Sequence, residues 1–332
     1  MNRLCSRSDI AVLAEFADGA PLPLATEMLG LARRLADETG GAVTAMALGT
    51  GMAGAGDALL AHGADRVFVA DDPALAPYQA DAWMAVLVDT LRDLAPAAVL
   101  AGHGAVGADL APRLAFRLET AAVTDCIAVS AEDGGLRFTR PCYGGKAHEV
   151  ISVKTAPAVV TLRAKSHAPA APDDSRRGEV VALSPDIDPA KVRTRIVEKR
   201  RDTDDGQRLD TARVVIAGGR GLDGAEGFQI AGDLADTLGG ALGASRVACD
   251  LGWCPPSRQI GLSGRTVAPE LYLALGISGA AQHMSGCAGA KTIVAVNTDA
   301  QAPIFKYCRF GVIGDCRELA AALIEALDNS AK

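Results

Sequence analysis

A glycine pattern in the second half of the chain could bind a phosphate group. Gly219, Gly221 and Gly224 form G-x-G-x-x-G between a predicted strand, Arg213–Ala217, and a predicted helix. Glycines let the backbone approach a pyrophosphate, and the free N–H groups at a helix start face its negative charge. Glycine is abundant in this chain, at 36 residues, so a tight strand-to-helix turn explains the pattern equally well.

A second candidate site follows the apolar run Leu271–Ile277. Ser278, Gln282 and His283 place a hydroxyl, an amide and an imidazole close together, separated by small residues. With the backbone amides of such a segment, they could hydrogen-bond a flat ligand. The alternative is a close-packed helix start in which His283 is a core histidine.

Polar residues end the other apolar runs of this half as well. Arg220, Ser278, Asn297 and Asp315 each stand at the carboxyl end of a predicted strand. In an open parallel sheet these ends share one rim, and ligands bind at that rim. The sequence therefore predicts one crevice.

Arg246 is the candidate for stabilising a negative charge. We expect it at the start of a strand over Ser245–Cys249. A lone arginine is usually a solvated ion-pair partner, but beside a ring that takes up electrons it would stabilise the anion. At about 4 Å and an effective dielectric constant of about 20, the attraction is roughly 4 kcal/mol. For a one-electron reduction, this free energy corresponds to a reduction potential higher by about 170 mV, because about 59 mV equals a tenfold change in the equilibrium constant.

Other motifs point to local structure or are missing. Gly102-His103-Gly104, Arg113 and the turn Arg140–Lys146 are interpreted as structural. The sequence contains no G-x-S-x-G or H-E-x-x-H motif, so hydrolytic chemistry has no support. The histidines and the eight cysteines are not spaced as metal ligands, so we expect no metal and reduced, buried thiols.

Strands and helices alternate through most of the first half. Leu24, Met28, Leu31 and Leu35 share one helical face, for example. This alternation predicts a parallel sheet covered by helices. The predicted strands and helices are Ile10–Ala14, Ala42–Leu48, Asp57–His62, Arg66–Ala70, Ala80–Leu94, Ala97–Ala101 and Gly107–Leu118.

The pattern changes between Thr124 and Arg163. Short β-rich runs there predict an antiparallel or edge extension, namely Ile127–Val129, Leu136–Phe138, Val150–Val153 and Ala158–Leu162. One more strand is expected at Lys191–Val197.

A charged stretch, Glu198–Asp210, marks the predicted domain boundary. We therefore expect an N-terminal domain over residues 1–200, a linker over 201–211 and a second domain over 212–332. The second domain restarts the alternation, with strands at Ile293–Val296 and Phe310–Ile313 and a closing helix at Glu318–Leu327.

Composition narrows the function classes. The chain has 332 residues, of which 49% are hydrophobic and only 4% aromatic, and its formal net charge is −7. An acidic chain with few aromatic rings is a poor candidate for binding nucleic acid or an anionic membrane. We find no apolar stretch long enough to span a bilayer and no signal-peptide pattern, so the expected location is the cytoplasm.

Several ordered motifs resemble the alpha subunit of electron transfer flavoprotein. The run from Val267 to His283 (VAPELYLALGISGAAQH) carries the strongest similarity. Similar segments of the second half, in the family's order, are Gly218–Gly221, Gly243–Arg246, Ala295–Asn297, Ala302–Phe305 and Gly311–Asp315. The first half is similar more loosely, through Asp109–Ala115 and the turn Arg140–Lys146.

The resemblance implies two α/β domains, each a mainly parallel sheet flanked by helices. The first would contact a beta subunit, and the second would be an FAD-binding Rossmann-like (DHS-like) domain. Arg246, Ser263 and His283 would tune the redox chemistry of the flavin, with Arg246 over its ring and His283 near its pyrimidine carbonyl side. The implied FAD-binding residues are Arg220, Ser245, Arg246, Ile260, Gly261, Leu262, Ser263, Ser278, Gly279, Ala280, Ala281, Gln282, His283, Asn297, Asp315 and Cys316.

The sequence departs from the family pattern at Leu262. The family commonly has Gln-Thr where this chain has Leu262-Ser263. Ser263 keeps a hydroxyl, but Leu262 cannot replace an amide donor, so the potential or the partner preference would differ. Cys316 stands where an apolar residue often follows the aspartate, and little effect is expected from it.

The resemblance implies an electron carrier rather than an enzyme acting on a small substrate. Flavin dehydrogenases, such as the acyl-CoA or dimethylglycine dehydrogenase type, would donate electrons, and a quinone oxidoreductase would accept them. One alternative is a flavin-bifurcating form that uses NADH, and another is a nucleotide-binding regulatory module without redox chemistry.

Overall fold

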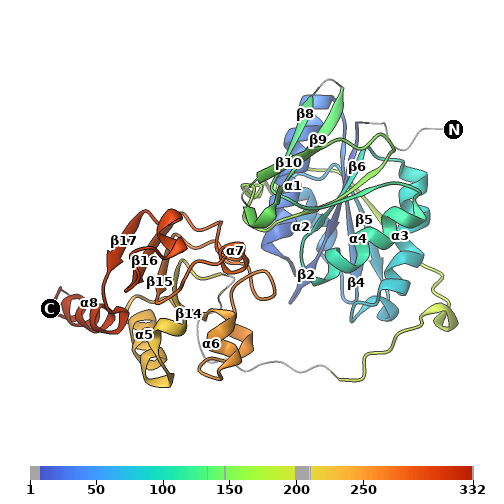
Figure 1. Cartoon of the computed structure of the whole chain (residues 1–332). Helices are drawn as coiled ribbons and strands as arrows, with labels where there is room; N and C mark the ends of the chain where they lie inside the picture. Colours follow the sequence, from blue (N-terminus) through green and yellow to red (C-terminus); the bar gives the residue numbers. More distant parts are fainter. Residues whose placement is uncertain (1–7, 133, 146, 199–208, 210, 331–332) are drawn as a thin grey trace. The chain divides into compact units, whose positions relative to one another are not determined.

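The computed structural model describes residues 8–132, 134–145, 147–198, 209 and 211–330 (Figure 1). The described residues divide into two compact units: the first holds those within 8–142 and 147–198, and the second holds 143–145, 209 and 211–330. Most of the expected linker, residues 201–208 and 210, lies outside the described residues.

The first unit contains a seven-stranded sheet in which every pairing is parallel. Its central strands are buried along their whole length, because helices cover both faces of the sheet. In order across the sheet the strands are β12 (Glu179–Leu183), β5 (Arg66–Asp71), β4 (Val43–Gly49), β1 (Ile10–Ala14), β6 (Ala98–Gly102), β11 (Ala158–Leu162) and β7 (Ala122–Cys126).

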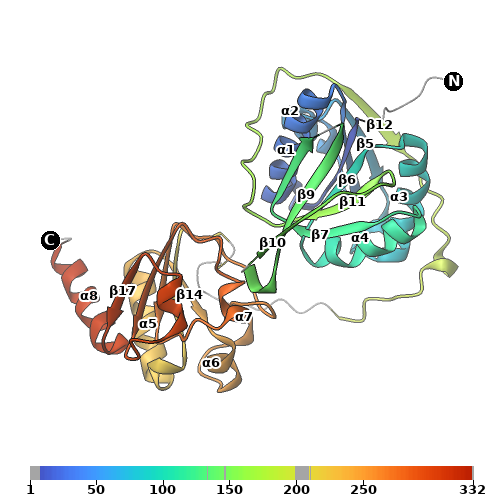
Figure 2. The same cartoon turned by 45° about the horizontal axis from the view of Figure 1, so that its top comes forward.

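Two pairs of helices cover the two faces of this sheet (Figure 2). Alternate residues of β1 point to opposite faces, so Ile10 and Val12 pack toward α1 and α2, while Ala11 and Leu13 pack toward α3 and α4. The helices are α1 (Pro23–Thr39), α2 (Ala55–Ala61), α3 (Ala80–Leu94) and α4 (Ala105–Arg117). α2, α3 and α4 begin and end within two residues of the predicted helices, and α1 contains the predicted face from Leu24 to Leu35, which confirms the α/β architecture.

The β-rich region after α4 contains a separate three-stranded antiparallel sheet, as predicted. Its strands are β8 (Ala128–Glu132), β9 (Gly135–Cys142) and β10 (Ala147–Ile151). The prediction was wrong for Ala158–Leu162, which forms β11 inside the large sheet and pairs in parallel with β6 and β7. All five residues of β11 are buried, as expected of a strand covered on both faces.

Two strands of the large sheet were not predicted, and a strand predicted near the end of the first unit is absent. β7 and β12 join the ends of the large sheet, where partial exposure gives a weak hydrophobic pattern. The prediction of a strand at Lys191–Val197 was wrong. The short helix η3 (Pro189–Lys191) is followed by irregular backbone through residue 198.

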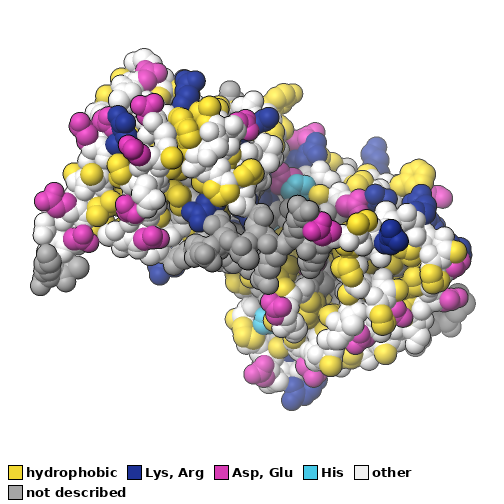
Figure 3. All heavy atoms as spheres, turned by 90° about the horizontal axis from the view of Figure 1, so that it is seen from below, with side chains coloured by type: hydrophobic (Ala, Val, Ile, Leu, Met, Phe, Trp, Pro, Cys, Tyr) yellow, Lys and Arg dark blue, Asp and Glu magenta, His cyan; other side chains and the backbone are white. Residues whose placement is uncertain are grey.

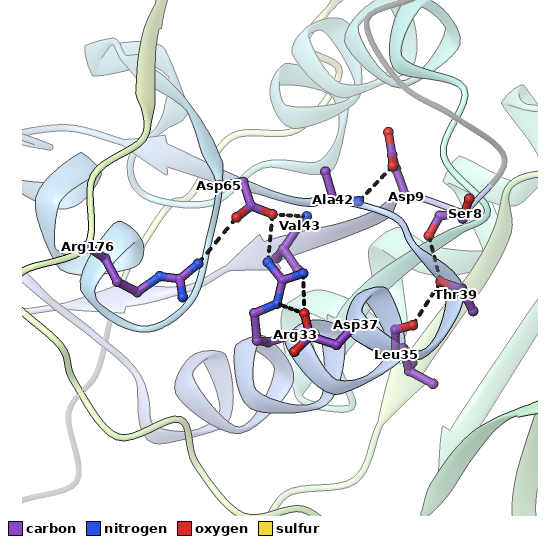
Figure 4. Close-up of polar contacts among 10 residues, drawn as sticks. All are labelled: Ser8, Asp9, Arg33, Leu35, Asp37, Thr39, Ala42, Val43, Asp65 and Arg176. Atoms are coloured by element: carbon purple, nitrogen blue, oxygen red, sulfur yellow. Dashed lines mark hydrogen bonds and ion pairs between the residues drawn. The ribbon is translucent and has the colours of Figure 1, made fainter.

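A charged network ties α1 to the amino ends of two strands in this unit (Figure 4). Asp65 accepts hydrogen bonds from the guanidinium groups of Arg33, at 2.7 Å, and Arg176, at 3.2 Å. The same carboxylate accepts the backbone N–H of Val43 at 2.8 Å. Arg33 also pairs with Asp37 one turn along α1, so the network is a structural brace.

The second unit is a five-stranded, all-parallel sheet. Across the sheet the strands are β14 (Ala241–Ala244), β13 (Val214–Gly218), β15 (Leu271–Leu275), β16 (Thr292–Asn297) and β17 (Phe310–Ile313). This is a doubly wound order. β14 is added on one side of β13, and β15, β16 and β17 are added on the other side, so the order of strand addition reverses between β13 and β15. Ligands bind outside the carboxyl ends of the strands at such a point.

Three helices pack on one face of the second sheet, and loops with one short helix cover the other. α5 (Ala225–Thr237), α6 (Arg246–Asp250) and α8 (Cys316–Ser330) bury the side chains of Ile216 and Leu273. On the other face, Tyr272 and Ala274 pack against the segment that carries α7 (Ala281–Met284).

The prediction of a strand at Ser245–Cys249 was wrong. The strand β14 ends at Ala244, Ser245 is extended, and α6 begins at Arg246. Ala248 and Cys249 are buried while Val247 is 47% exposed, so the apolar run is one face of a short helix together with an exposed valine.

The structure confirms the predicted fold class of two units, each a mainly parallel sheet flanked by helices. Within the described ranges, none of the helices is both long and apolar enough to cross a bilayer. On the face drawn in Figure 3, acidic and basic side chains are interspersed rather than gathered by sign.

Candidate functional site

A cavity of about 830 Å³ lies at the carboxyl ends of the strands in the second unit. This volume is within the usual range for pockets that hold cofactors. The walls come from the segments after β13, β14, β15 and β16 and from a loop that follows α6. The lining residues are Gly219, Arg220, Gly221, Ser245, Arg246, Val247, Gln259, Ile260, Gly261, Leu262, Ser263, Gly276, Ile277, Ser278, Ala280, Gln282, His283, Asn297 and Asp299.

Glycines let the backbones after β13 and β15 cross in direct contact at one side of this cavity. A Cβ atom on Gly219 would lie 2.3 Å from the carbonyl oxygen of Gly276. Gly221 donates its backbone N–H to the same oxygen at 3.0 Å. The first two glycines of the G-x-G-x-x-G pattern are therefore needed for a tight crossing, and both still line the cavity.

Gly279 is required for a similar reason. Its φ angle is 84°, and a Cβ atom there would lie 2.4 Å from the backbone of Ile304. The carbonyl of Ser278 accepts the N–H of Ile304 at 3.0 Å, which holds this turn against η6 (Pro303–Lys306). Gly279 itself is buried beneath the turn and does not line the cavity.

The charged side chains of the cavity give it a positive character. Two guanidinium groups, Arg220 and Arg246, line it together with one carboxylate, Asp299. The side chain of Arg246 is 70% exposed and pairs with Asp250 at 3.3 Å across one helical turn. Such an exposed pair is worth less than about 1 kcal/mol, so Arg246 can turn toward an anion in the cavity at little cost.

The loop Ile260–Arg265 forms one wall and is held by backbone hydrogen bonds. The backbone N–H of Ile260 donates to the carbonyl oxygen of Ala244 at 2.9 Å, and the backbone N–H of Leu262 donates to the carbonyl oxygen of Gln282 at 2.7 Å. The hydroxyl of Ser263 accepts a hydrogen bond from the Gln259 side chain at 3.0 Å. The side chain of Leu262 is 77% exposed, although it is apolar.

His283 is buried at the cavity wall, with 8% of its surface exposed. Its Nε2 lies 2.8 Å from the hydroxyl of Tyr272, a residue of β15 that is fully buried. Burial lowers the pKa of His283 to about 4, with the nearby Ile260 backbone opposing the shift, so the ring is neutral at pH 7. Burial likewise raises the pKa of Tyr272 well above its usual value.

Asn297 braces the end of β16. Its side-chain amide donates to the Ile277 carbonyl at 3.0 Å, and its side-chain oxygen accepts the N–H of Asp299 at 2.9 Å. The side chain therefore links the ends of β15 and β16 while it lines the cavity.

Most of the residues selected from the sequence gather at this cavity. Those that line it are Arg220, Ser245, Arg246, Ile260, Gly261, Leu262, Ser263, Ser278, Ala280, Gln282, His283 and Asn297. Gly279, Ala281, Asp315 and Cys316 belong to the same rim of the sheet but not to the lining. The carboxylate of Asp315 accepts hydrogen bonds from Arg317, and Cys316 is buried with its sulfur 3.5 Å from the Gly221 carbonyl.

Sequence reasoning missed Val247, Gln259 and Asp299 among the lining residues. Asp299 follows Asn297 at the end of a predicted strand, and that position was a usable signal. Val247 was assigned to a strand, and Gln259 lies in a long loop that no periodic pattern describes.

Comparison with known proteins gives a consistent result along the chain. The family model described as "Electron transfer flavoprotein domain" matches residues 10–188, and the one described as "Electron transfer flavoprotein FAD-binding domain" matches residues 208–288.

Curated relatives cover nearly the whole chain. The protein named electron transfer flavoprotein subunit alpha from Thermoanaerobacterium thermosaccharolyticum is 38% identical over 96% of this chain and 97% of its own length. That of Bacillus subtilis is 39% identical over 95% and 96%. A protein named FixB from Clostridium saccharobutylicum is 37% identical over 94% of each chain.

Proposed function

This chain belongs to the electron transfer flavoprotein alpha-subunit family, and we propose that it forms a heterodimer with a beta subunit and carries electrons on an FAD bound in the cavity of its second unit. The family's FAD-binding domain spans residues 208–288, and the cavity residues after β13, β14 and β15 fall within it. In this proposal the first unit supplies the surface that contacts the beta subunit, and residues 201–211 form the linker.

The chemistry of the cavity fits FAD. A volume of about 830 Å³ and a net positive lining suit a ligand that combines flat rings with a diphosphate. Glycines 219 and 221 let the backbones after β13 and β15 cross, and both line the cavity beside Arg220, whose charge suits a diphosphate. A buried, unpaired nitrogen of His283 also needs a hydrogen-bonding partner that the described residues do not supply.

The side chains have separable tasks in this proposal. Arg220 and the residues after β13 bind the diphosphate, and the segment Ser278–His283 orients the ring system and the ribityl chain. Asn297 holds the adenosine end, with Asp315 and Cys316 behind it. Bound FAD supplies the capacity to take up and release electrons singly, and Arg246, as a guanidinium near the ring, stabilises its negatively charged reduced forms.

The donors we propose are flavin dehydrogenases, of the acyl-CoA or dimethylglycine dehydrogenase type, and the acceptor is a quinone oxidoreductase. The cavity of the second unit supports a carrier role, because it collects groups that bind a cofactor and a guanidinium that stabilises negative charge. A carrier needs to hold and tune its cofactor, and a site of this kind is sufficient for that task.

The test is to copurify the chain with its beta subunit and record the visible spectrum. We expect flavin absorbance that a cognate dehydrogenase bleaches in the presence of its substrate. A colourless pair that takes up no added FAD would contradict FAD binding in this cavity. A yellow pair that no flavin dehydrogenase reduces would contradict the proposed donors alone.

A second candidate is a flavin-bifurcating form that uses NADH, and the departure from the family pattern that bears on the flavin potential is Leu262. Its exposed apolar side chain stands at the cavity where the family commonly supplies an amide, so the flavin potential would differ from the usual type. NADH oxidation by the purified pair, with two flavins bound per pair, would support this candidate. One flavin per pair and no reaction with NADH would exclude it.

A further inference from the structure

Three ionisable side chains form a buried cluster behind the wall of the cavity. Tyr272 and Cys287 are fully buried, and His283 is 8% exposed. Tyr272 comes from β15, while His283 lies in α7 and Cys287 one turn beyond it. The hydroxyl of Tyr272 and Nε2 of His283 are 2.8 Å apart, a hydrogen bond of good length.

The position of the proton in this hydrogen bond follows from the neighbouring groups. The thiol of Cys287 is oriented to donate to the backbone carbonyls of His283, at 3.8 Å, and Met284, at 3.7 Å. A neutral imidazole nitrogen is a much better acceptor than a thiol sulfur. The Tyr272 hydroxyl therefore donates to Nε2, and a neutral His283 must carry its own proton on Nδ1.

Nδ1 of His283 lacks a hydrogen-bonding partner within the part of the chain that the structure describes. It is buried and makes no hydrogen bond to any described residue, although the Ile260 backbone lies near enough to the ring to oppose the fall in its pKa. Buried polar groups are nearly always paired, so an unpaired donor at a cavity wall indicates an acceptor that comes from outside the chain. His283 lines the cavity, and Nδ1 is the ring nitrogen that Tyr272 leaves unoccupied.

We propose that Tyr272 is a positioning residue that locks His283 in the Nδ1–H tautomer, so that the histidine presents an N–H donor to a carbonyl oxygen of the bound ligand. Identifying that oxygen as the pyrimidine carbonyl of FAD rests on the proposed function above, but the tautomer itself does not. Without the Tyr272 hydroxyl, the proton is free to move to Nε2, and Nδ1 becomes an acceptor that repels a carbonyl oxygen.

The tautomer can be read directly by 15N NMR of imidazole-labelled histidine. The full chain, in the assembly in which it is purified, is examined with FAD removed, and the His283→Gln variant assigns the signals among the five histidines. We expect a protonated Nδ1 and an unprotonated Nε2 for His283. A protonated Nε2 in the wild-type protein would overturn the proposal.

The Tyr272→Phe variant tests the lock itself. We expect the His283 signals to move toward the Nε2–H tautomer and the dissociation constant for FAD to rise about tenfold, the size typical of one lost hydrogen bond. Cys287→Ala is the matched control, because the Cys287 thiol is the other side chain that interacts with the Tyr272 hydroxyl, and its removal should leave the Nδ1–H tautomer in place. An unchanged tautomer in Tyr272→Phe would also overturn the proposal.

These measurements separate the two proposals. If the protein takes up no FAD but His283 shows the Nδ1–H tautomer, the tautomer lock stands and the proposed function fails. If FAD binds and the tautomer is Nε2–H, the proposed function stands and the lock is wrong.

Discussion

Gly276 and Gly221 lie so close together that a Cβ atom on Gly276 would be 2.6 Å from the Cα atom of Gly221. Gly276 also has a φ angle of 62°, in the left-handed region. The two glycines mark the place where the chain leaves β15 and crosses the turn after β13, which is the switch point of the sheet. The cavity therefore depends on two backbones that touch without side chains.

Replacing Gly276 with alanine should damage both the fold of the second unit and the cavity. The left-handed φ angle alone costs about 1 kcal/mol for a residue with a Cβ atom, and the clash with the Gly221 backbone adds to it. We expect a lower unfolding midpoint in urea and weaker binding of FAD.

Gly232→Ala is the matched control for this variant. Gly232 lies inside α5, and an added Cβ atom would meet only a Leu242 methyl group at 3.8 Å. Alanine in a helix interior is favoured over glycine by up to about 1 kcal/mol, so this variant should be as stable as the wild type or more so. Equal stability of Gly276→Ala and the wild type would contradict the role of the crossing.

Removing the charge of Arg246 should lower the reduction potential of bound FAD. The upper bound is about 170 mV, from about 4 kcal/mol for a guanidinium at 4 Å from a negative ring. Arg246→Lys retains the charge and should retain most of the potential. Spectroelectrochemical titration of the two variants measures this difference, and an unchanged potential in Arg246→Ala would show that Arg246 does not face the flavin.

Sequence patterns predicted best the elements that are buried on one side or both. The helix Ala80–Leu94 and the fully buried strand Ile10–Ala14 were predicted at their observed boundaries. The strand Phe310–Ile313 was predicted as well, because its run is apolar, although all four of its residues are exposed. Ser245–Cys249 was misassigned because the apolar residues of a very short helix are adjacent in sequence, as they are in a strand. β12 was missed because an edge strand whose residues are mostly exposed lacks a periodic pattern.

The candidate site was predictable where a single stretch of sequence carries it. Ser278, Gln282 and His283 follow one strand, so their proximity follows from local geometry. The neighbourhood of Tyr272 and His283 could not be predicted, because it depends on how α7 folds back over β15. The crossing of Gly221 and Gly276 likewise involves backbones 55 positions apart in the chain (276 − 221 = 55).

The buried histidine predicts a pH dependence of stability in the second unit. Folding lowers the pKa of His283 from 6.5 to about 4, because its burial disfavours the charged ring. The unfolded chain therefore binds a proton that the folded chain does not, and stability falls as the pH drops from 6.5 toward 4. The full loss is about 3 kcal/mol, at about 1.4 kcal/mol for each pH unit of the shift.

Urea unfolding of the FAD-free protein across this pH window measures the effect. A Trp83→Phe background leaves Trp253, in the second unit, as the one tryptophan that reports unfolding. His283→Gln in that background should show a flatter dependence on pH than the parent protein. Parallel pH profiles would mean that His283 is not the group responsible.

The hydrogen bonds around Asp65 should contribute to the stability of the first unit. Asp65→Asn leaves Arg33, Arg176 and the Val43 N–H with weaker acceptors, and we expect a loss of about 1–3 kcal/mol in the free energy of unfolding. Asp37→Asn removes only the exposed helical partner of Arg33 and should change stability by less than about 0.5 kcal/mol. Equal losses in the two variants, by urea unfolding, would contradict the assigned brace.

Leu262→Gln tests whether the loop Ile260–Arg265 sets the reduction potential of bound FAD. Because the side chain is 77% exposed, the substitution should change the free energy of unfolding by no more than about 0.5 kcal/mol. Glutamine adds an amide donor beside the Ser263 hydroxyl at the cavity wall, and a donor near a ring that gains negative charge raises its reduction potential. Ser263→Ala removes a donor at the same wall and should shift the potential in the opposite direction. Potentials that do not move in either variant, with FAD still bound, would place the ring away from the loop Ile260–Arg265.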